Sequence, residues 1–232
     1  MPGSGCQADR PMWSPLWITI RVTVLAGSLA AVVGTVAGYT LAKSRFRGRR
    51  LVEAVLSLPI VLPPTVLGYY LLVVLGRRST VGQWWEDLTG SPIAFTLTGA
   101  VVAASVSALP YVLRAARAAI EGVDPRLEAA ARTMGLAESR VAWHVTVPVA
   151  RRSIAAGVAL GFARALGDFG ATVMLAGNIP GRTQTMPIAL YDAVQANDQG
   201  RARSLSIVLG LLAIGLLMVV NRLGDTPRRA TR

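Results

Sequence analysis

Long apolar stretches alternate with short polar segments along this chain. Three stretches are almost free of charge and approach or exceed the roughly 20 residues that a helix needs to cross about 30 Å of hydrocarbon. These are residues 16–42, 54–75 and 204–220. Residues 93–113 and 153–176 are also apolar enough to span, although the second stretch carries Arg164 and Asp168. The pattern predicts an all-α membrane protein with about five transmembrane helices.

Composition supports a membrane location independently of the pattern. Hydrophobic residues make up 53% of the chain and charged residues only 16%, which is not the composition of a soluble domain. The formal net charge of +12 would suit nucleic acid if basic residues lined one soluble face with aromatics. Here the basic residues flank apolar spans, so we expect no nucleic-acid partner and a chain in contact with membrane lipid.

The basic residues also predict an orientation, because Arg and Lys in short loops stay on the cytoplasmic side. With the N-terminus outside, 16 basic residues fall inside and 7 outside. We expect a flexible external N-terminus at 1–15, a single membrane domain at 16–221 and a cytoplasmic basic tail at 222–232. Residues 1–15 lack the basic cluster of a secretory signal, so the first span should remain in the mature protein.

Proline residues interrupt the second span, at Pro59, Pro63 and Pro64. Each proline removes a backbone donor and obstructs the preceding turn, which predicts a kinked or broken helix. A broken helix in a membrane usually lines a cavity, but a kink satisfied by neighbouring helices is equally compatible with the residues.

Arg164 and Asp168 lie four residues apart on one helical face of the fourth span. They form either an ion pair or, through Arg164, a contact to a passing anion.

A polar, helix-prone insert separates the third and fourth spans, within residues 114–152. Asp124 and Pro125 are typical of a helix start, and Gly135 is a natural stop. Glu128 and Arg132 are spaced for an exposed ion pair, while small alanines keep the helix slim enough to enter a groove on a partner. A surface helix without a partner is the alternative.

Several chemistries have no support in the sequence. Cys6 is the only cysteine and His144 the only histidine, so we expect no disulfide, no metal site and no cofactor. The phosphate-binding pattern GxxxxGK[ST] is absent, so the chain has no ATPase site of the usual kind. Neither a nucleophile and base pair nor a carboxylate pair lies in a plausible aqueous pocket, and we expect no catalytic residues.

The spacing of the insert resembles the coupling motif of ABC-importer permeases. Its matching residues are Glu128, Ala129, Ala130, Gly135, Val145, Val147 and Pro148. Further similarity lies in LPIVLPPTVLGYY at 58–70, FARALGDFGAT at 162–172 and GNIPGRTQTMP at 177–187. Over nearly the whole chain, from Trp17 to Val220, the sequence resembles permeases of the molybdate and sulfate family. Val145, Val147 and Asp168 depart from the usual Ile, Leu and Glu.

The resemblance implies the ABC-importer permease fold and a role in molybdate import, with tungstate also possible. It implies a homodimer, two ATPase subunits docked on residues 128–135, and a periplasmic or lipoprotein molybdate-binding protein, in a bacterial or archaeal cell membrane. Some relatives carry a sixth helix. The candidate residues for the pathway or gate are Pro59, Pro63, Pro64, Thr65, Arg164, Asp168 and Thr172. Alternatives are a sulfate or thiosulfate ABC permease, an ATP-independent secondary transporter or channel, and a membrane scaffold without a transport role.

Overall fold

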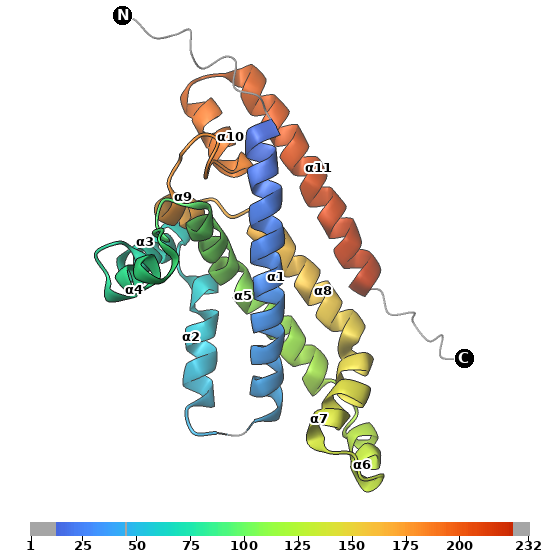
Figure 1. The fold of residues 1–232 in the computed structure, drawn as a ribbon. Helices are drawn as coiled ribbons and strands as arrows, with labels where there is room; N and C mark the ends of the chain where they lie inside the picture. Colours follow the sequence, from blue (N-terminus) through green and yellow to red (C-terminus); the bar gives the residue numbers. More distant parts are fainter. Residues whose placement is uncertain (1–12, 45, 225–232) are drawn as a thin grey trace, which may run out of the picture.

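A computed structural model describes residues 13–44 and 46–224, and within them the fold is entirely helical (Figure 1). The predicted fold class is therefore confirmed. The elements are α1 (Trp13–Lys43), α2 (Arg49–Val61), α3 (Pro64–Leu75), α4 (Thr80–Thr89), α5 (Leu97–Glu121), α6 (Pro125–Thr133), α7 (Glu138–Val141), a π-helical turn (Ala142–Thr146), α8 (Val147–Leu166), α9 (Gly170–Ala176), α10 (Met186–Gln195) and α11 (Gln199–Gly224).

The core of the bundle is the contact between α1 and α5, which small residues make possible. Gly34 and Gly38 of α1 lie against α5, where a Cβ at Gly38 would come within 2.8 Å of the Leu113 carbonyl oxygen. Ala26 and Ala104 are fully buried in the same cluster. Apolar side chains gain little by leaving lipid for a helix interface, so close backbone approach across small residues supplies the packing energy here.

Four helical segments of the described chain are long and apolar enough to cross a membrane: Trp13–Lys43, Leu97–Glu121, Glu138–Leu166 and Gln199–Arg222. The pair α2 and α3 passes the same test but bends by 119° between its two halves, which gives up to five spans. The bend has a local cause. A residue before proline is pushed out of helical geometry, and both Leu62 (ψ 137°) and Pro63 (ψ 134°) precede a proline and are extended. Pro59 lies inside α2 without ending it.

The predicted span at 153–176 is wrong as a single helix. α8 ends at Leu166, and the short α9 begins separately at Gly170. The Asp168 carboxylate accepts a hydrogen bond from the backbone N–H of Thr172, four residues later. This bond satisfies one of the free amides at the start of α9. The helix before this break begins earlier than the predicted start at residue 153. One continuous helical segment runs from Glu138 to Leu166.

Several predicted boundaries also shift. α1 begins at Trp13, so the last three residues of the predicted flexible segment 1–15 are helical; residues 1–12 lie outside the described residues. α5 begins at Leu97 and continues to Glu121, past the predicted end of its span. α11 begins at Gln199 and includes Arg222, the first residue of the predicted tail, whereas residues 225–232 lie outside the described residues.

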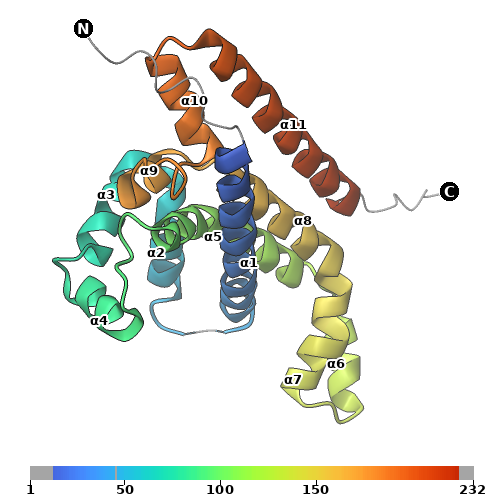
Figure 2. The ribbon, with the colours of Figure 1, turned by 45° about the horizontal axis from the view of Figure 1, so that its top comes forward.

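The ends of the helices separate into two groups (Figures 1 and 2). The end of α1, the start of α2, α6 and α7 lie at one end of the bundle, and α10 with the start of α11 lies at the other. α4 lies to one side, next to α3. The insert therefore projects from a single end of the molecule, away from α10.

The close approach of α1 and α5 makes a stability prediction. Gly38→Leu should destabilise the folded chain by about 1–3 kcal/mol, because the new side chain overpacks the α5 backbone. Gly210→Leu in α11 is the matched control, since a Cβ there meets no atom within 4 Å. The measurement is thermal unfolding of the purified chain in detergent. Equal unfolding temperatures of the two variants would contradict the assigned interface.

Candidate coupling segment and transport pathway

The polar insert, which we call the coupling segment (residues 124–148), begins and ends its first helix as the sequence predicts. The Asp124 carboxylate accepts the backbone N–H of Arg126 at 2.9 Å, and Pro125 occupies the first turn of α6. α6 ends at Thr133, and Gly135 then adopts a φ of +82°. This left-handed conformation strains residues that carry a Cβ. It lets the chain reverse into α7.

A π-helical turn joins α7 to α8, and Pro148 accounts for it. Pro148 has no N–H to donate to the carbonyl of His144 in a regular α-helix. The Val147 N–H instead bonds the Ala142 carbonyl, five residues earlier. Such turns insert one extra residue and are frequent at functional sites. In this position the turn places Thr146, which is 1% exposed, beside α6.

Glu128 is the centre of a clasp between three parts of the chain. Lys43, at the end of α1, donates to both Glu128 carboxylate oxygens at 2.5 and 2.7 Å. The hydroxyl of Thr146 donates to Glu128 Oε1 at 2.7 Å, and Arg132 lies at 3.5 Å. Burial raises the pKa of Glu128, but the hydrogen bonds from Lys43 and Thr146 outweigh it and hold the pKa below the usual value. The carboxylate is therefore charged at neutral pH.

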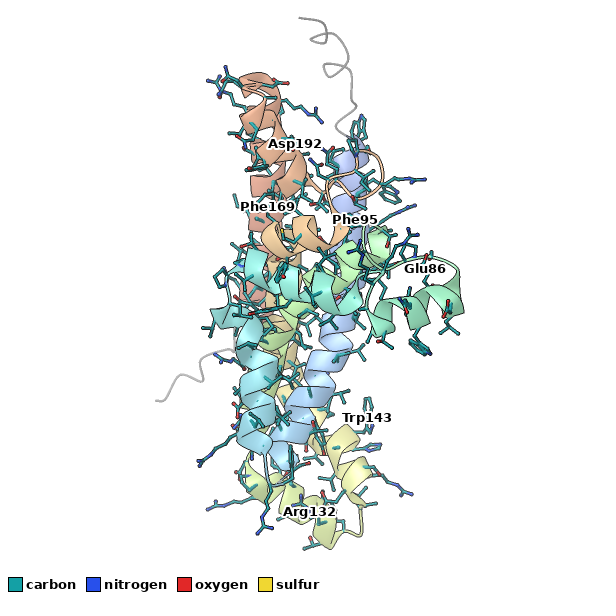
Figure 3. The ribbon with its side chains drawn as sticks, turned by 90° about the vertical axis from the view of Figure 1, so that its left-hand side faces the viewer. Glu86, Phe95, Arg132, Trp143, Phe169 and Asp192 are labelled. Carbon is teal, nitrogen blue, oxygen red and sulfur yellow. The ribbon has the colours of Figure 1, made fainter. Side chains whose placement is uncertain are left out.

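The position of Glu128 corrects one expectation. The sequence predicts an exposed pair of Glu128 with Arg132, yet the Glu128 side chain is only 6% exposed and points into the chain. Arg132 is the exposed member, and its guanidinium reaches Glu138 of α7 at 2.5 Å. The hydrogen bond from Arg132 holds the pKa of Glu138 below its usual value. Figure 3 shows Arg132 near the tip of the coupling segment and Trp143 on its outside.

The outer face of α6, with Met134 directly after its end, instead presents apolar side chains that the motif did not indicate. Met134 is 74% exposed and Leu127 is 47% exposed, and the motif residues Ala129 and Ala130 are exposed with them. Leu127 and Met134 are seven residues apart, which is the signal in the sequence for one helical face. Of the other motif residues, Pro148 is exposed while Val145 and Val147 are partly buried on the helix that returns to the bundle.

A second group of predicted residues meets where two helices are interrupted. An open pocket of about 430 Å³ is lined by the residues Pro64, Thr65, Arg164, Gly167, Asp168, Phe169 and Gly170. The start of α3 touches the start of α9, because a Cβ at Gly170 would lie 2.8 Å from Pro64 Cβ. Pro59, Pro63 and Thr172 do not line this pocket.

Arg164 and Asp168 form the ion pair that their spacing predicts, with Nη1 and Oδ1 3.0 Å apart. The Asp168 side chain is fully buried, whereas that of Arg164 is 22% exposed. The second Asp168 oxygen accepts the backbone N–H of Thr172 at 3.0 Å and its hydroxyl at 2.7 Å. Asp168 is thus held by its neighbours; both residues line the open pocket, and Arg164 is the more exposed of the two. Among the described residues, no group of histidine, cysteine and carboxylate side chains could hold a metal ion.

Comparison with known proteins identifies the family. Residues 30–226 match the family described as binding-protein-dependent transport system inner membrane component. The chain belongs to this family. It is a multi-pass membrane permease of the ABC-importer type, and the resemblance noted in the sequence is confirmed.

Relatives and solved structures agree with this assignment. The chain is 44% identical to the molybdenum transport system permease protein ModB of Escherichia coli (strain K12), over 80% of this chain and 82% of that protein. It is 30% identical to the sulfate transport system permease protein CysT of Synechocystis sp., over 85% and 69% of the two chains. The fold resembles the MetNI methionine ABC transporter in inward-facing conformations, with a TM-score of 0.71, 18% identity and coverage of 91% of this chain and 95% of that chain.

The clasp around Glu128 makes a prediction about local stability. Lys43→Met should leave the buried carboxylate short of its main partner and favour local opening of the coupling segment by about 1–2 kcal/mol. Hydrogen exchange of the amides of α6 should then accelerate about tenfold, while amides in the middle of α5 stay unchanged. Lys43→Arg keeps the charge and is the control. Unchanged exchange in Lys43→Met would refute a stabilising role for the clasp.

Proposed function

We propose that this chain is the membrane permease of an importer that takes up molybdate and is driven by a separate ATPase subunit. The observation that carries the proposal is the coupling segment, a structured polar projection from one end of an apolar bundle whose relatives are molybdenum permeases. The chain itself has no GxxxxGK[ST] phosphate loop, so a partner must bind and hydrolyse ATP.

The ATPase docks on the exposed face of α6. Leu127 and Met134 supply apolar contact area there, and the small side chains of Ala129 and Ala130 let a groove close around the helix. Glu128 acts from the inner face, where its bond to Lys43 ties α6 to the end of α1. Movement of the docked helix is therefore passed to the bundle through α1 as well as through α8. The complete complex contains a second copy of this chain and two ATPase subunits.

The transported anion passes the pocket at Arg164. A guanidinium suits a tetrahedral oxyanion, but the carboxylate of Asp168, 3.0 Å away, offsets much of its charge, so Arg164 mainly balances Asp168 and contributes little to holding the anion. A site of this kind holds an anion weakly, as transport requires, so tight and selective binding belongs to a separate binding protein. That protein docks at the end of the bundle opposite to the coupling segment. The coupling segment lies in the cytosol of a bacterial or archaeal cell, the N-terminus lies outside, and the C-terminus lies inside.

Sulfate is the second candidate substrate. It is also a tetrahedral dianion, and the chain shares 30% identity with a sulfate permease. The larger identity to molybdenum permeases favours molybdate.

Uptake measurements test both the identity of the substrate and the docking of the ATPase on the coupling segment. Cells that lack this chain should accumulate little molybdenum from micromolar molybdate, and the wild-type gene should restore it, as measured by elemental analysis. A Met134→Lys variant should insert normally but fail to restore uptake, because a charge replaces an apolar contact with the ATPase. Trp84→Ala is the control, since Trp84 is 62% exposed on α4, away from the coupling segment. Restoration of sulfur uptake without molybdenum uptake would assign sulfate instead.

A double variant separates the two roles of Arg164. If Arg164 mainly balances Asp168, Arg164→Gln combined with Asp168→Asn should transport better than either single variant, because the cost arises from one unpaired buried charge. We expect this outcome, with uptake within about threefold of wild type for the double variant and at least tenfold lower for Asp168→Asn. Asparagine can still accept the Thr172 N–H. A stable, assembled double variant without uptake would place Arg164 on the anion path as an essential contact.

A further inference from the structure

Ion pairs join the start of α2 to the end of α5, and the two helices pack side by side (Figure 2). Arg49 of α2 bonds Glu121 of α5 at 3.1 Å, and Arg117 bonds the same carboxylate at 2.8 Å. Arg117 also pairs with Glu53 of α2. Glu53 and Glu121 are the only acidic residues of α2 and α5. Two guanidinium groups and two carboxylates therefore balance one another in this network.

Arg114 continues this row one turn further from the end of α5, but without a carboxylate. Its Nε donates to the hydroxyl of Ser57 in α2 at 3.3 Å, and Ser57 is 6% exposed. Arg114 itself is exposed and forms no ion pair with any residue that the structure describes. The other helices packed most closely on α5, which are α1, α3, α8 and α9, contain no acidic residue. Arg114 thus keeps an uncompensated charge within the candidate span Leu97–Glu121, where a cation needs water or an anionic partner.

The packing of α5 on α8 places Arg114 between the coupling segment and the Arg164 pocket. A Cβ at Gly157 of α8 would meet the Cβ of Ala115, the residue after Arg114. Arg164 lies seven residues beyond Gly157, which corresponds to roughly 10 Å along the helix axis. Because α8 begins at the coupling segment, Arg114 lies on that side of the pocket.

α2 connects the two arginines, and their charges differ. Ser57 lies seven residues before Pro64, which lines the Arg164 pocket. Asp168 offsets the charge of Arg164 at 3.0 Å, whereas no carboxylate offsets that of Arg114. The bond to Ser57 uses Nε alone, and Nη1 and Nη2 of Arg114 form no hydrogen bond with another described residue. Two fixed N–H donors of a guanidinium suit two oxygens of a tetrahedral oxyanion.

We propose that Arg114 binds the transported oxyanion after it leaves the Arg164 pocket, on the side of the coupling segment. This inference rests on the proposed import function. The Ser57 hydroxyl holds the guanidinium toward α2, and the anion accepts hydrogen bonds from the two remaining nitrogens. The phosphate of a lipid headgroup has the same oxyanion chemistry, and the experiment separates it from a free anion.

Cysteine labelling of the full-length chain in phosphatidylcholine nanodiscs tests the contact directly. Cys6, the only cysteine, is replaced by serine, and Ala118→Cys places a thiol four residues after Arg114, at an exposed position on the same face of α5. The uncharged reagent N-ethylmaleimide is added with sodium molybdate, or with sodium chloride at equal ionic strength. A site with a Kd of about 1 mM should lower the labelling rate about threefold at roughly 2 mM molybdate.

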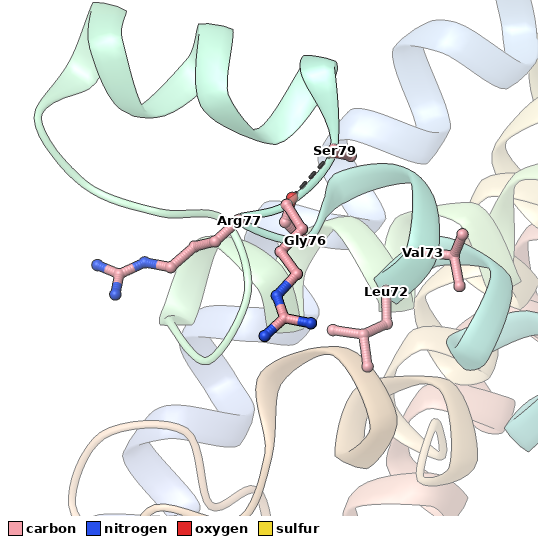
Figure 4. A pocket seen from close by; sticks show the side chains of 6 residues that line it. Leu72, Val73, Gly76, Arg77 and Ser79 are labelled. Atoms are coloured by element: carbon pink, nitrogen blue, oxygen red, sulfur yellow. Dashed lines mark hydrogen bonds between the residues drawn. The ribbon is translucent and has the colours of Figure 1, made fainter.

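Matched variants make this protection specific to Arg114. Arg114→Gln should abolish it, and Arg114→Lys should retain part of it, which provides a second test if the glutamine variant folds poorly. Arg77→Gln should keep full protection. Arg77 is an exposed arginine in the turn after α3, it pairs with Glu86 at 3.0 Å, and its guanidinium points away from Leu72 and Val73 (Figure 4).

Three results would overturn the proposal. They are equal protection with and without Arg114, no protection or no labelling of Ala118→Cys, and labelling that falls when phosphatidylglycerol is added to the nanodiscs but ignores molybdate. The last result would assign Arg114 to a lipid phosphate. Uptake by the wild-type chain decides the import function separately, so a chain that imports molybdate without this protection keeps its proposed function and lacks the second site.

Discussion

Backbone amides and carbonyls inside a bilayer have no water with which to form hydrogen bonds. A membrane helix can therefore be interrupted only where other protein groups form hydrogen bonds with the freed backbone groups. This chain interrupts two helices, at Leu62–Pro63 and at Gly167–Phe169, and it packs the interruptions together. Asp168 satisfies an amide at the start of α9, and α9 lies against α3 at Gly68 and Gly170. The pocket that contains Arg164 exists because these two breaks meet, and the helices around it are positioned by that contact.

The parts of the fold that depend on local sequence could be predicted. Apolar stretches indicated the spans, the prolines at 63 and 64 indicated the break, and Asp124, Pro125 and Gly135 indicated the limits of α6. The ion pair of Arg164 and Asp168 followed from a spacing of four residues. In each case the interacting groups are neighbours in sequence, so periodicity and turn chemistry contain the information.

The parts that depend on distant contacts could not be predicted. The partner of Glu128 is Lys43, 85 residues away, and only the folded chain brings them together. Without that contact, the sequence predicts an exposed Glu128, and the motif does not single out the exposed residues Leu127 and Met134. The apolar composition of residues 153–176 predicts one helix, while the break at Gly167 depends on the Asp168 carboxylate, which caps the next helix. Hydropathy measures affinity for lipid and carries no information about such a cap.

The continuous helical segment from Glu138 to Leu166 has a mechanical consequence. It contains 29 residues, which at 1.5 Å per residue corresponds to a rod about 43 Å long. One end belongs to the coupling segment and the other carries Arg164. A tilt of about 10° around the coupling end would displace the far end by roughly 7.5 Å for a rod of this length. In the proposed importer, this segment would act as a lever that passes a modest rotation of the coupling segment on to the Arg164 pocket.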